Sequence, residues 1–209
     1  KTFAYLVPAL LKALKDDEQV VISTNTKALQ DQIYYKDLQF LEQNFPYTFQ
    51  YSKLKWRKNY LSVLRYFEFI LDGGVFQQEE IWFLSKVSLW LFDTQLWELD
   101  ELNFYPHEQY HVKNIHSDHF LVLFESNEYK QYEYIFKARN HAIASQIVII
   151  NHSLLIQDKA SSQPIFGHIQ NLIIDEWHNI EDTLTDAMIK SFSLQSLQDS
   201  IHHVENALK

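Results

Sequence analysis

The chain has 209 residues, of which 46% are hydrophobic and 15% aromatic, with only 3 glycines and 4 prolines, so it is not a disordered, collagen-like or linker-dominated polypeptide. Its formal net charge of -9 argues against a histone-like protein that covers nucleic acid with its whole surface, although a local basic groove is compatible with it. The absence of cysteine excludes disulfides and thiolate-held metal sites within this chain. Since no apolar run reaches the roughly 18 to 20 residues that span a bilayer, we expect a soluble, cytoplasmic protein without membrane contact.

Residues 1–33 predict a helix, a strand and a second helix. Apolar positions recur with helical spacing over residues 1–15, and the lysines near the end of this segment suit a helix C-terminus. Residues 19–24 form a short β-branched run, after which Thr26 is well placed to cap a new helix. Helix, strand and helix in this order begin an α/β unit.

The middle of the chain, residues 51–140, has no comparable aliphatic strand. Residues 77–102 are rich in tryptophan, leucine and phenylalanine at three- and four-residue spacings, which favours helices with a wide apolar face. We therefore predict a mainly helical insertion here, and we expect Trp82, Trp90 and Trp97 to lie in its core.

The α/β pattern returns near the other end of the chain. Helical spacing over residues 137–145 leads to an aliphatic strand at residues 146–152, and a second aliphatic run ends in Asp175 and Glu176. In open α/β sheets ligands bind at the carboxyl ends of the strands, which makes polar residues at these ends candidate site residues. The alternative is that these acids simply begin a helix, where the helix dipole favours them. Residues 183–209 predict further helix.

Two short motifs predict phosphate and magnesium chemistry. Lys1 and Thr2 before a helix match the end of a phosphate loop of the form GxxxxGKT, in which the lysine reaches the terminal phosphates and the hydroxyl holds Mg²⁺. A second strand that ends in Asp175 and Glu176 supplies an acid that organises Mg²⁺ and a base that positions the attacking water. Each motif is weak alone, but the two occur in the expected order.

The densest basic run of this acidic chain is KLKWRKNY, residues 53–60, in which cations alternate with aromatic rings. Cations that neutralise phosphates and rings that stack on bases are typical of proteins that bind single-stranded nucleic acid. A charge run of this kind also occurs as an ordinary solvated face, so both interpretations stay open.

Five segments closely resemble, in the same order, the motifs of the DinG and XPD group of superfamily 2 DNA helicases: KTFAYLVPAL, VISTNTKALQDQI, LKWRKNYL, QIVIINHSLL and LIIDEWHNIED. The resemblance covers nearly all of residues 1–65 and 138–182. It implies an α/β fold, a RecA-like P-loop NTPase domain with a parallel sheet and a mainly helical insertion. It also implies an ATP-dependent DNA helicase that uses ATP and Mg²⁺, acts on single-stranded DNA and takes part in DNA repair. The implied domains are 1–50 and 141–182 for the RecA-like domain, 51–140 for the insertion, and 183–209 for the start of an arch-like insertion.

The resemblance assigns roles to individual residues. Lys1 and Thr2 would complete a Walker A loop whose glycines precede them, and Thr2 and Asp175 would hold Mg²⁺. In a DEAH box with Trp177 in place of the usual alanine, Glu176 would polarise the attacking water and His178 would link the nucleotide to DNA-contacting loops. The implied DNA-binding residues are Thr24, Asn25, Thr26, Gln30, Lys55, Trp56, Arg57, Lys58, Asn59, Tyr60, Asn151 and His152.

The largest departure from the family concerns its iron–sulfur cluster. Members with a cluster place a first cysteine at the position of Ser62 and three more before the segment that matches Ala138 and Arg139, and this chain has none of the four. A serine does not supply the soft thiolate that a cluster needs, so we expect a cluster-free branch, which resembles forms with an upstream exonuclease domain. A second RecA-like domain would complete the ATP site, so we expect this chain alone to be inactive. A non-catalytic DNA-binding or scaffold module is the alternative.

A competing motif is His107-Glu108-Gln109-Tyr110-His111, a literal HExxH, which in zinc hydrolases places two imidazoles on one helical face with a glutamate base. Glu125 or Glu128 would be the third ligand of such a site. Five-residue patterns recur by chance, so we expect these histidines to be ordinary surface or core residues, with a zinc metallohydrolase as the lesser alternative.

Overall fold

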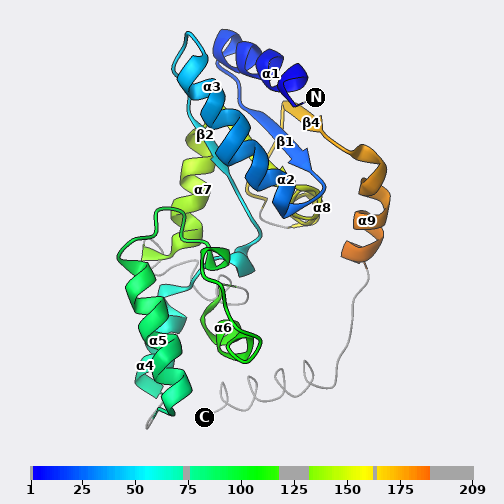
Figure 1. Ribbon diagram of the computed structural model, residues 1–209. Helices are drawn as coiled ribbons and strands as arrows, with labels where there is room; N and C mark the ends of the chain where they lie inside the picture. The colour runs from blue at the N-terminus through cyan, green and yellow to red at the C-terminus, as the bar shows by residue number, and fades with distance from the viewer. Residues whose placement is uncertain (1, 73–75, 118–131, 162–163, 189–209) are drawn as a thin grey trace.

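The computed structural model describes residues 2–72, 76–117, 132–161 and 164–188. Figure 1 shows a sheet with helices around it and a group of helices beyond one end of that sheet. The strands are β1 (Val20–Thr24), β2 (Tyr51–Lys53), β3 (Ile147–Asn151) and β4 (Asn171–Ile174). The α-helices are α1 (Phe3–Asp16), α2 (Lys27–Gln32), α3 (Gln39–Asn44), α4 (Val63–Asp72), α5 (Gln78–Leu91), α6 (Gln109–Ile115), α7 (Tyr134–Ala144), α8 (His152–Ala160) and α9 (Ile180–Met188).

The four strands form one parallel sheet in the order β2-β3-β1-β4. The central strands β1 and β3 are buried along almost their whole length, as expected of aliphatic runs that are covered on both faces. This confirms the predicted α/β fold with a parallel sheet, an arrangement consistent with a RecA-like domain.

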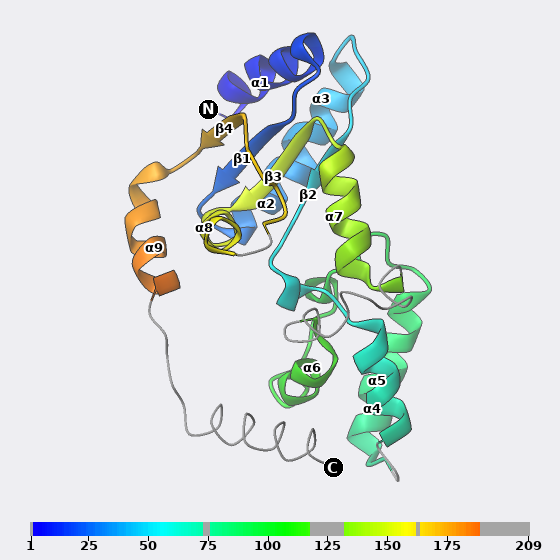
Figure 2. The same ribbon diagram turned by 180° about the vertical axis from the view of Figure 1, so that it is seen from behind.

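Helices cover both faces of this sheet, as the two views in Figures 1 and 2 show. Alternate residues of β1 point to opposite faces, so Val20 and Ile22 enter one core and Val21 enters the other. The first core is completed by α1 and by the continuous helical stretch from α2 through a π-helical segment (Ile33–Leu38) to α3. The second is completed by α7 and α8.

The predicted helical insertion has a core of its own. Helices α4, α5 and α6 surround a cluster of buried side chains made of Leu61, Tyr66, Phe83, Val87, Trp90, Leu99 and Ile115. In Figures 1 and 2 these helices lie beyond the lower end of α7, away from the sheet. The insertion is therefore a separate packing unit joined to the sheet domain.

The insertion is shorter than residues 51–140. Tyr51–Lys53 pair with β3 as strand β2, and α7 packs on the sheet through Ile135, Ala138 and Ala142. Strand β2 escaped prediction because it has only three residues, two of them polar, and its burial comes from its neighbours in the sheet. The predicted helix over residues 77–102 is α5 alone, which ends at Leu91. Of the helix predicted over residues 183–209, residues 183–188 belong to α9, and residues 189–209 lie outside the described residues.

The three tryptophans of the insertion have different environments. Trp90 is buried, as predicted, and its indole N–H donates to Glu101 Oε2 at 3.1 Å. Trp97 stacks on Tyr134 with ring centroids 5.6 Å apart. Trp82 is 68% exposed, so the prediction that it lies in the core is wrong. Among the described helices, none is long and apolar enough to span a membrane.

Candidate nucleotide and DNA site

The polar ends of three strands meet at one edge of the sheet. The register pairs Thr24 at the end of β1 with Asn151 at the end of β3, and Ser23 with Ile174 at the end of β4. Asp175 continues β4, and its backbone N–H donates to the Ser23 carbonyl at 2.9 Å. The predicted site residues of the two aliphatic strands are thus neighbours because all the strands run in parallel.

The carboxylate of Asp175 lies beside the start of α1. Its Oδ2 accepts a hydrogen bond from the Tyr5 hydroxyl at 3.0 Å, and its Oδ1 accepts one from the Glu176 backbone N–H at 3.0 Å. Burial, the bond to Asp175 and the charge of that carboxylate raise the pKa of Tyr5, while a bond with the Thr2 side chain has the opposite effect. Thr2, Tyr5 and Asp175 therefore share one locus, and sequence reasoning missed Tyr5.

This locus suits magnesium and phosphate chemically. Mg²⁺ is usually held by one or two protein carboxylates together with waters and substrate phosphates, and a hydroxyl such as that of Thr2 is a further hard oxygen ligand. Helix α1 begins beside Thr2 without an acidic residue in its first turn, which leaves its N-terminal dipole to favour an anion. Lys1 lies outside the described residues. Within them, no cluster of three or more histidines or acids could hold a metal ion alone.

Glu176 and the two residues after it form a tight turn. Glu176 has a φ of 54°, in the left-handed region, which costs a residue with a Cβ on the order of 1 to 3 kcal/mol. Trp177 is 72% exposed, so its large ring fits without displacing the core. His178 is also exposed, and its Nε2 lies 3.0 Å from the Asn179 side-chain nitrogen. His178 contacts its own neighbour here rather than the predicted DNA-contacting loops.

The residues after β1 divide into buried and accessible members. Thr24 and Gln30 are fully buried, and the Gln30 side chain donates to the carbonyls of Leu54 and Ile149 at 2.9 and 2.8 Å. Thr26 is exposed, and its hydroxyl caps α2 by accepting from the Leu29 N–H at 3.2 Å, as predicted. Of the predicted phosphate contacts in this segment, Asn25 and Thr26 are accessible, whereas Thr24 and Gln30 hold the local backbone.

The two predicted DNA-binding residues at the end of β3 also hold the local structure. Asn151 caps α8, since its Oδ1 accepts from the Leu154 N–H at 2.9 Å. His152 is fully buried, and its Nδ1 lies 2.7 Å from the Ser23 hydroxyl. A side chain in that position cannot touch DNA in this conformation, which corrects the prediction for His152.

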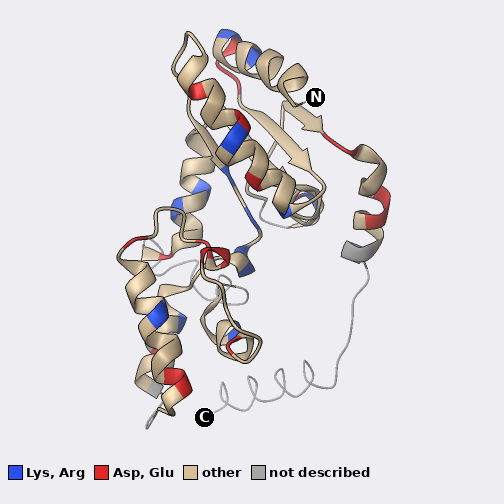
Figure 3. Cartoon of the chain, in the orientation of Figure 1, with Lys and Arg blue, Asp and Glu red and all other residues tan. Residues whose placement is uncertain are grey.

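Part of the predicted basic run is buried and paired. Lys53 and Lys55 lie 3.0 and 2.8 Å from the same Glu98 carboxylate oxygen, and all three side chains are 2 to 3% exposed. Asp31 and Asp100 add contacts at the border of this cluster, with Lys53 2.6 Å from Asp31 and Lys55 3.4 Å from Asp100. Burial is the largest single effect and would lower the pKa of each lysine, but Glu98 and Asp31 together with the other contacts outweigh it, and the pKa of each is raised. Both lysines are therefore charged and already paired with carboxylates. Figure 3 marks the positions of the basic and acidic residues along the chain in blue and red.

Two more residues of the run face inward. Tyr60 is 1% exposed, and its hydroxyl accepts from the Lys55 backbone N–H at 3.0 Å. Asn59 is buried between Lys27 and the Trp56 carbonyl. The prediction that Lys55, Asn59 and Tyr60 contact DNA directly is corrected accordingly, because their polar groups or rings are occupied by the protein.

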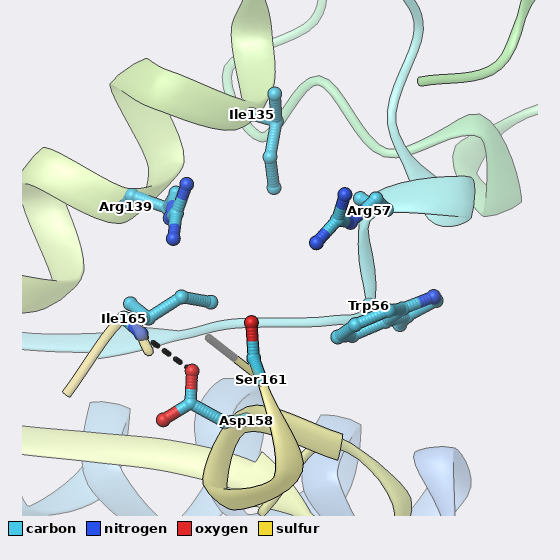
Figure 4. Close-up of a pocket in the computed structure, with 7 residues that line it drawn as sticks. All are labelled: Trp56, Arg57, Ile135, Arg139, Asp158, Ser161 and Ile165. Carbon is cyan, nitrogen blue, oxygen red and sulfur yellow. Dashed lines mark hydrogen bonds between the residues drawn. The ribbon is translucent and has the colours of Figure 1, made fainter. Parts of the chain in front are cut away.

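The outward part of the run lines a pocket that brings a second arginine to it (Figure 4). The guanidinium of Arg57 lies 4.8 Å from the Trp56 ring centre, and Arg139 of α7 faces it across the pocket. Burial and the positive charge of Arg57 lower the pKa of Arg139, and the negative charge of Asp158 partly opposes them. Asp158 also lines the pocket, but its carboxylate accepts from the backbone of residues 165 and 166.

Neither Arg57 nor Arg139 forms an ion pair or hydrogen bond with another described residue. The two half-buried guanidiniums repel each other, the charge of Asp158 offsets this only in part, and an anion between the guanidiniums would reduce the repulsion further. Sequence reasoning had only used Arg139 to align a motif. No local signal marks it, because its partner Arg57 is brought to it by the packing of α7 against the segment after β2.

The HEQYH motif does not form a zinc site in the described structure. Helix α6 begins at Gln109, so His107 precedes it and stacks on Tyr105 instead. Glu108 accepts hydrogen bonds from Lys86 at 2.9 Å and from the Tyr105 backbone N–H. The His111 ring lies against Phe83 with centroids 5.3 Å apart. Glu125 and Glu128, the predicted third ligands, fall outside the described residues.

Comparison with known proteins finds relatives over almost the entire chain. The chain is 28% identical over 216 residues to the 3'-5' exonuclease DinG of Bacillus subtilis, and this alignment covers 98% of the chain and 22% of that protein. It is 29% identical over 203 residues to the ATP-dependent DNA helicase YoaA of Haemophilus influenzae, and 28% identical over 203 residues to YoaA of Escherichia coli. Each YoaA alignment covers 95% of this chain and 31% of the relative. No family model matches the chain.

These similarities confirm the resemblance to DinG-like helicases on which the motifs were aligned. The chain spans between about a fifth and a third of the length of these relatives. The proteins named as exonuclease and those named as helicase both match nearly the whole of this chain.

Proposed function

We propose that this chain is the part of a DinG-like, ATP-dependent DNA helicase that binds the phosphates of ATP and contacts single-stranded DNA. The observation that carries the proposal is the Asp175 carboxylate at the end of β4, hydrogen-bonded to Tyr5 at the start of α1. An acid beside a helix N-terminus at the carboxyl edge of a parallel sheet is the arrangement that nucleotide-binding α/β domains use.

In this proposal Thr2 and Asp175 hold Mg²⁺, and Lys1 reaches the terminal phosphates. Glu176 orients the attacking water, which is the role of the base in phosphoryl transfer. Mg²⁺ neutralises charge on the transferred phosphate when it is bound. Tyr5 fixes the Asp175 carboxylate through its hydroxyl at 3.0 Å, so that the acid is oriented before nucleotide binds. A second RecA-like domain would supply the arginine that completes the site.

We propose that single-stranded DNA passes over two accessible groups. One is Asn25 and Thr26 after β1, whose polar groups suit phosphate oxygens. The other is the pocket of Trp56, Arg57 and Arg139, in which paired guanidiniums would hold a phosphate and the indole would stack on a base. The exonuclease activity named for the Bacillus subtilis relative is assigned, in this proposal, to a part of that protein outside the matched segment.

The insertion is proposed to need no iron–sulfur cluster. Ser62, at the place of the first cluster cysteine, is 1% exposed and donates to Glu133 Oε1 at 3.1 Å. The same Glu133 oxygen accepts from the Leu64 N–H at 3.0 Å, which ties the start of α4 to the start of α7. Hydrogen bonds and the aromatic core then hold together what a cluster would otherwise hold.

The test is ATP hydrolysis by the intact protein with and without single-stranded DNA. Wild type should hydrolyse ATP faster with DNA, and Glu176→Gln should bind ATP but hydrolyse it roughly 10² to 10⁴ times more slowly, the usual worth of a positioned base. Glu181→Gln, an exposed acid of α9, is the matched control and should leave the rate unchanged. A normal rate in Glu176→Gln would disprove the assignment of the acidic motif.

A further inference from the structure

A buried serine–histidine pair lies directly behind the proposed ATP site. Ser23 of β1 and His152 at the start of α8 are both fully buried, and the Ser23 hydroxyl is 2.7 Å from His152 Nδ1. The pair joins the strand that leads to Asn25 and Thr26 with the helix that follows β3. The DNA-binding role predicted for His152 does not explain it, because no part of this imidazole reaches solvent.

The His152 ring lies near the backbone of the acidic loop, Asp175 and Glu176. His152 Nε2 is buried and has no hydrogen-bond partner among the described residues, which is costly for a polar atom. Burial lowers the pKa of His152, and nearby backbone groups of Glu176 and Asp175 partly oppose this effect. The ring is thus neutral at pH 7 and lies close to the backbone of the two proposed catalytic acids.

Ser23 contacts that loop a second time. Its carbonyl accepts the Asp175 backbone N–H at 2.9 Å, while its hydroxyl engages His152. Ser23 therefore holds Asp175 directly through its carbonyl and holds through its hydroxyl the imidazole that lies near the backbone of Glu176. Glu176 adopts a left-handed backbone conformation, which persists only when its surroundings hold it.

We propose that the Ser23–His152 pair is a positioning element that sets the backbone of Asp175 and Glu176 and couples it to the DNA-facing end of β1. The Ser23 hydroxyl donates to Nδ1, which places the ring proton on Nε2, where it faces the loop. When Asn25 and Thr26 engage a DNA backbone, a small shift of β1 reaches the acidic loop through Ser23. The proposal rests on the proposed function, because it needs the acids to act on ATP.

Three variants of His152 separate its two nitrogens. The amide nitrogen of His152→Gln can reach the position of Nε2, so this variant should keep most of the DNA-stimulated rate. His152→Asn retains a polar group only near Nδ1, and His152→Phe retains only volume. We expect both to lower the DNA-stimulated kcat by on the order of 10-fold or more, the scale on which displaced catalytic groups lose rate, with an unchanged KM for ATP.

The measurement is the steady-state ATPase of the intact protein with saturating single-stranded DNA, together with the melting temperature of every variant. Ser23→Ala should lower kcat in the same direction but less, since the carbonyl contact to Asp175 stays. Ser145→Ala is the matched control, because Ser145 is equally buried and donates to the His141 carbonyl at 2.8 Å, away from the acidic loop. It should leave kcat unchanged.

The outcomes distinguish this inference from the function on which it rests. A folded His152→Asn protein with the wild-type kcat overturns the coupling role and leaves the ATPase assignment intact. Equal losses of kcat in His152→Gln and His152→Asn, with equally lowered melting temperatures, would show that His152 only fills space. An intact wild-type protein that does not hydrolyse ATP overturns both proposals. A lower kcat in His152→Asn and His152→Phe, with a kcat near wild type in His152→Gln, supports the coupling role.

Discussion

The basic run after β2 contains two groups of cations with opposite environments. Lys53 and Lys55 point into the junction between sheet and insertion, where they share Glu98. Arg57, two residues further, points into a pocket opposite Arg139, and neither arginine forms an ion pair with another described residue. A basic sequence motif therefore does not by itself define a binding surface. The paired lysines stabilise the junction between sheet and insertion, whereas the arginines of the pocket form no ion pair and can bind an anionic ligand.

The largest effect is expected from removing the shared partner of the lysines. Glu98→Gln leaves two buried ammonium groups without their central carboxylate, so we expect about 3 to 5 kcal/mol lower stability. Urea unfolding followed by tryptophan fluorescence measures it. An unchanged midpoint would mean that the cluster is hydrated, and the distinction between the two groups of cations would fail.

The next effect concerns the unpaired arginines. The double variant Arg57→Gln/Arg139→Gln should weaken binding of single-stranded DNA on the order of 10²-fold, since hydrogen bonds to charged groups contribute about 1.5 to 3 kcal/mol each. Each lost phosphate contact should also reduce the slope of affinity against salt by about 0.7. Titration of labelled oligonucleotides at several salt concentrations measures both quantities.

The control for this pair is Lys15→Gln, an exposed cation at the far end of α1, which should change neither affinity nor slope. Because the two guanidiniums repel in the free protein, the double variant should be at least as stable as wild type. Loss of DNA binding together with loss of stability would instead place these arginines in the same structural class as the lysines.

A smaller effect is expected from the ring beside Arg57. Trp56→Ala should cost about 1 to 3 kcal/mol of binding free energy if a base stacks on the indole, with little change in the salt slope, since stacking releases no counterions. The same titrations report it. A reduced slope in this variant would indicate that Trp56 acts only by orienting Arg57, whose guanidinium lies 4.8 Å from its ring.

The smallest effect is expected from Asp100, at the border of the cluster formed by Lys53, Lys55 and Glu98. Burial alone would raise the pKa of Asp100, but Lys27 and Lys55 outweigh it and lower the pKa. The stability that Asp100 contributes is therefore present above its ordinary pKa of 3.8 and is lost as pH falls through the lowered folded value. Because the side chain is 46% exposed, Asp100→Asn should cost only about 0.2 to 1 kcal/mol at pH 7, measured by urea unfolding.

Local patterns in the sequence determined the α/β class, helix α1, strands β1, β3 and β4, and the Thr26 cap. These features follow from the spacing of apolar residues and from cap chemistry within a few residues. The common edge of Thr24, Asn151 and Asp175 was also predictable, since parallel strands bring their carboxyl ends together.

Tertiary structure decided which of the predicted site residues face a ligand. Lys55 is neutralised by Glu98, and Arg57 faces Arg139, although both partners lie far along the chain. His152 is enclosed by Ser23 and the acidic loop. Burial and charge pairing depend on which distant segments pack together, and this cannot be inferred from the type of a residue or from the spacing of its neighbours. The sequence alone therefore identified the cations of the basic run, but it could not separate the paired lysines from the arginines of the pocket.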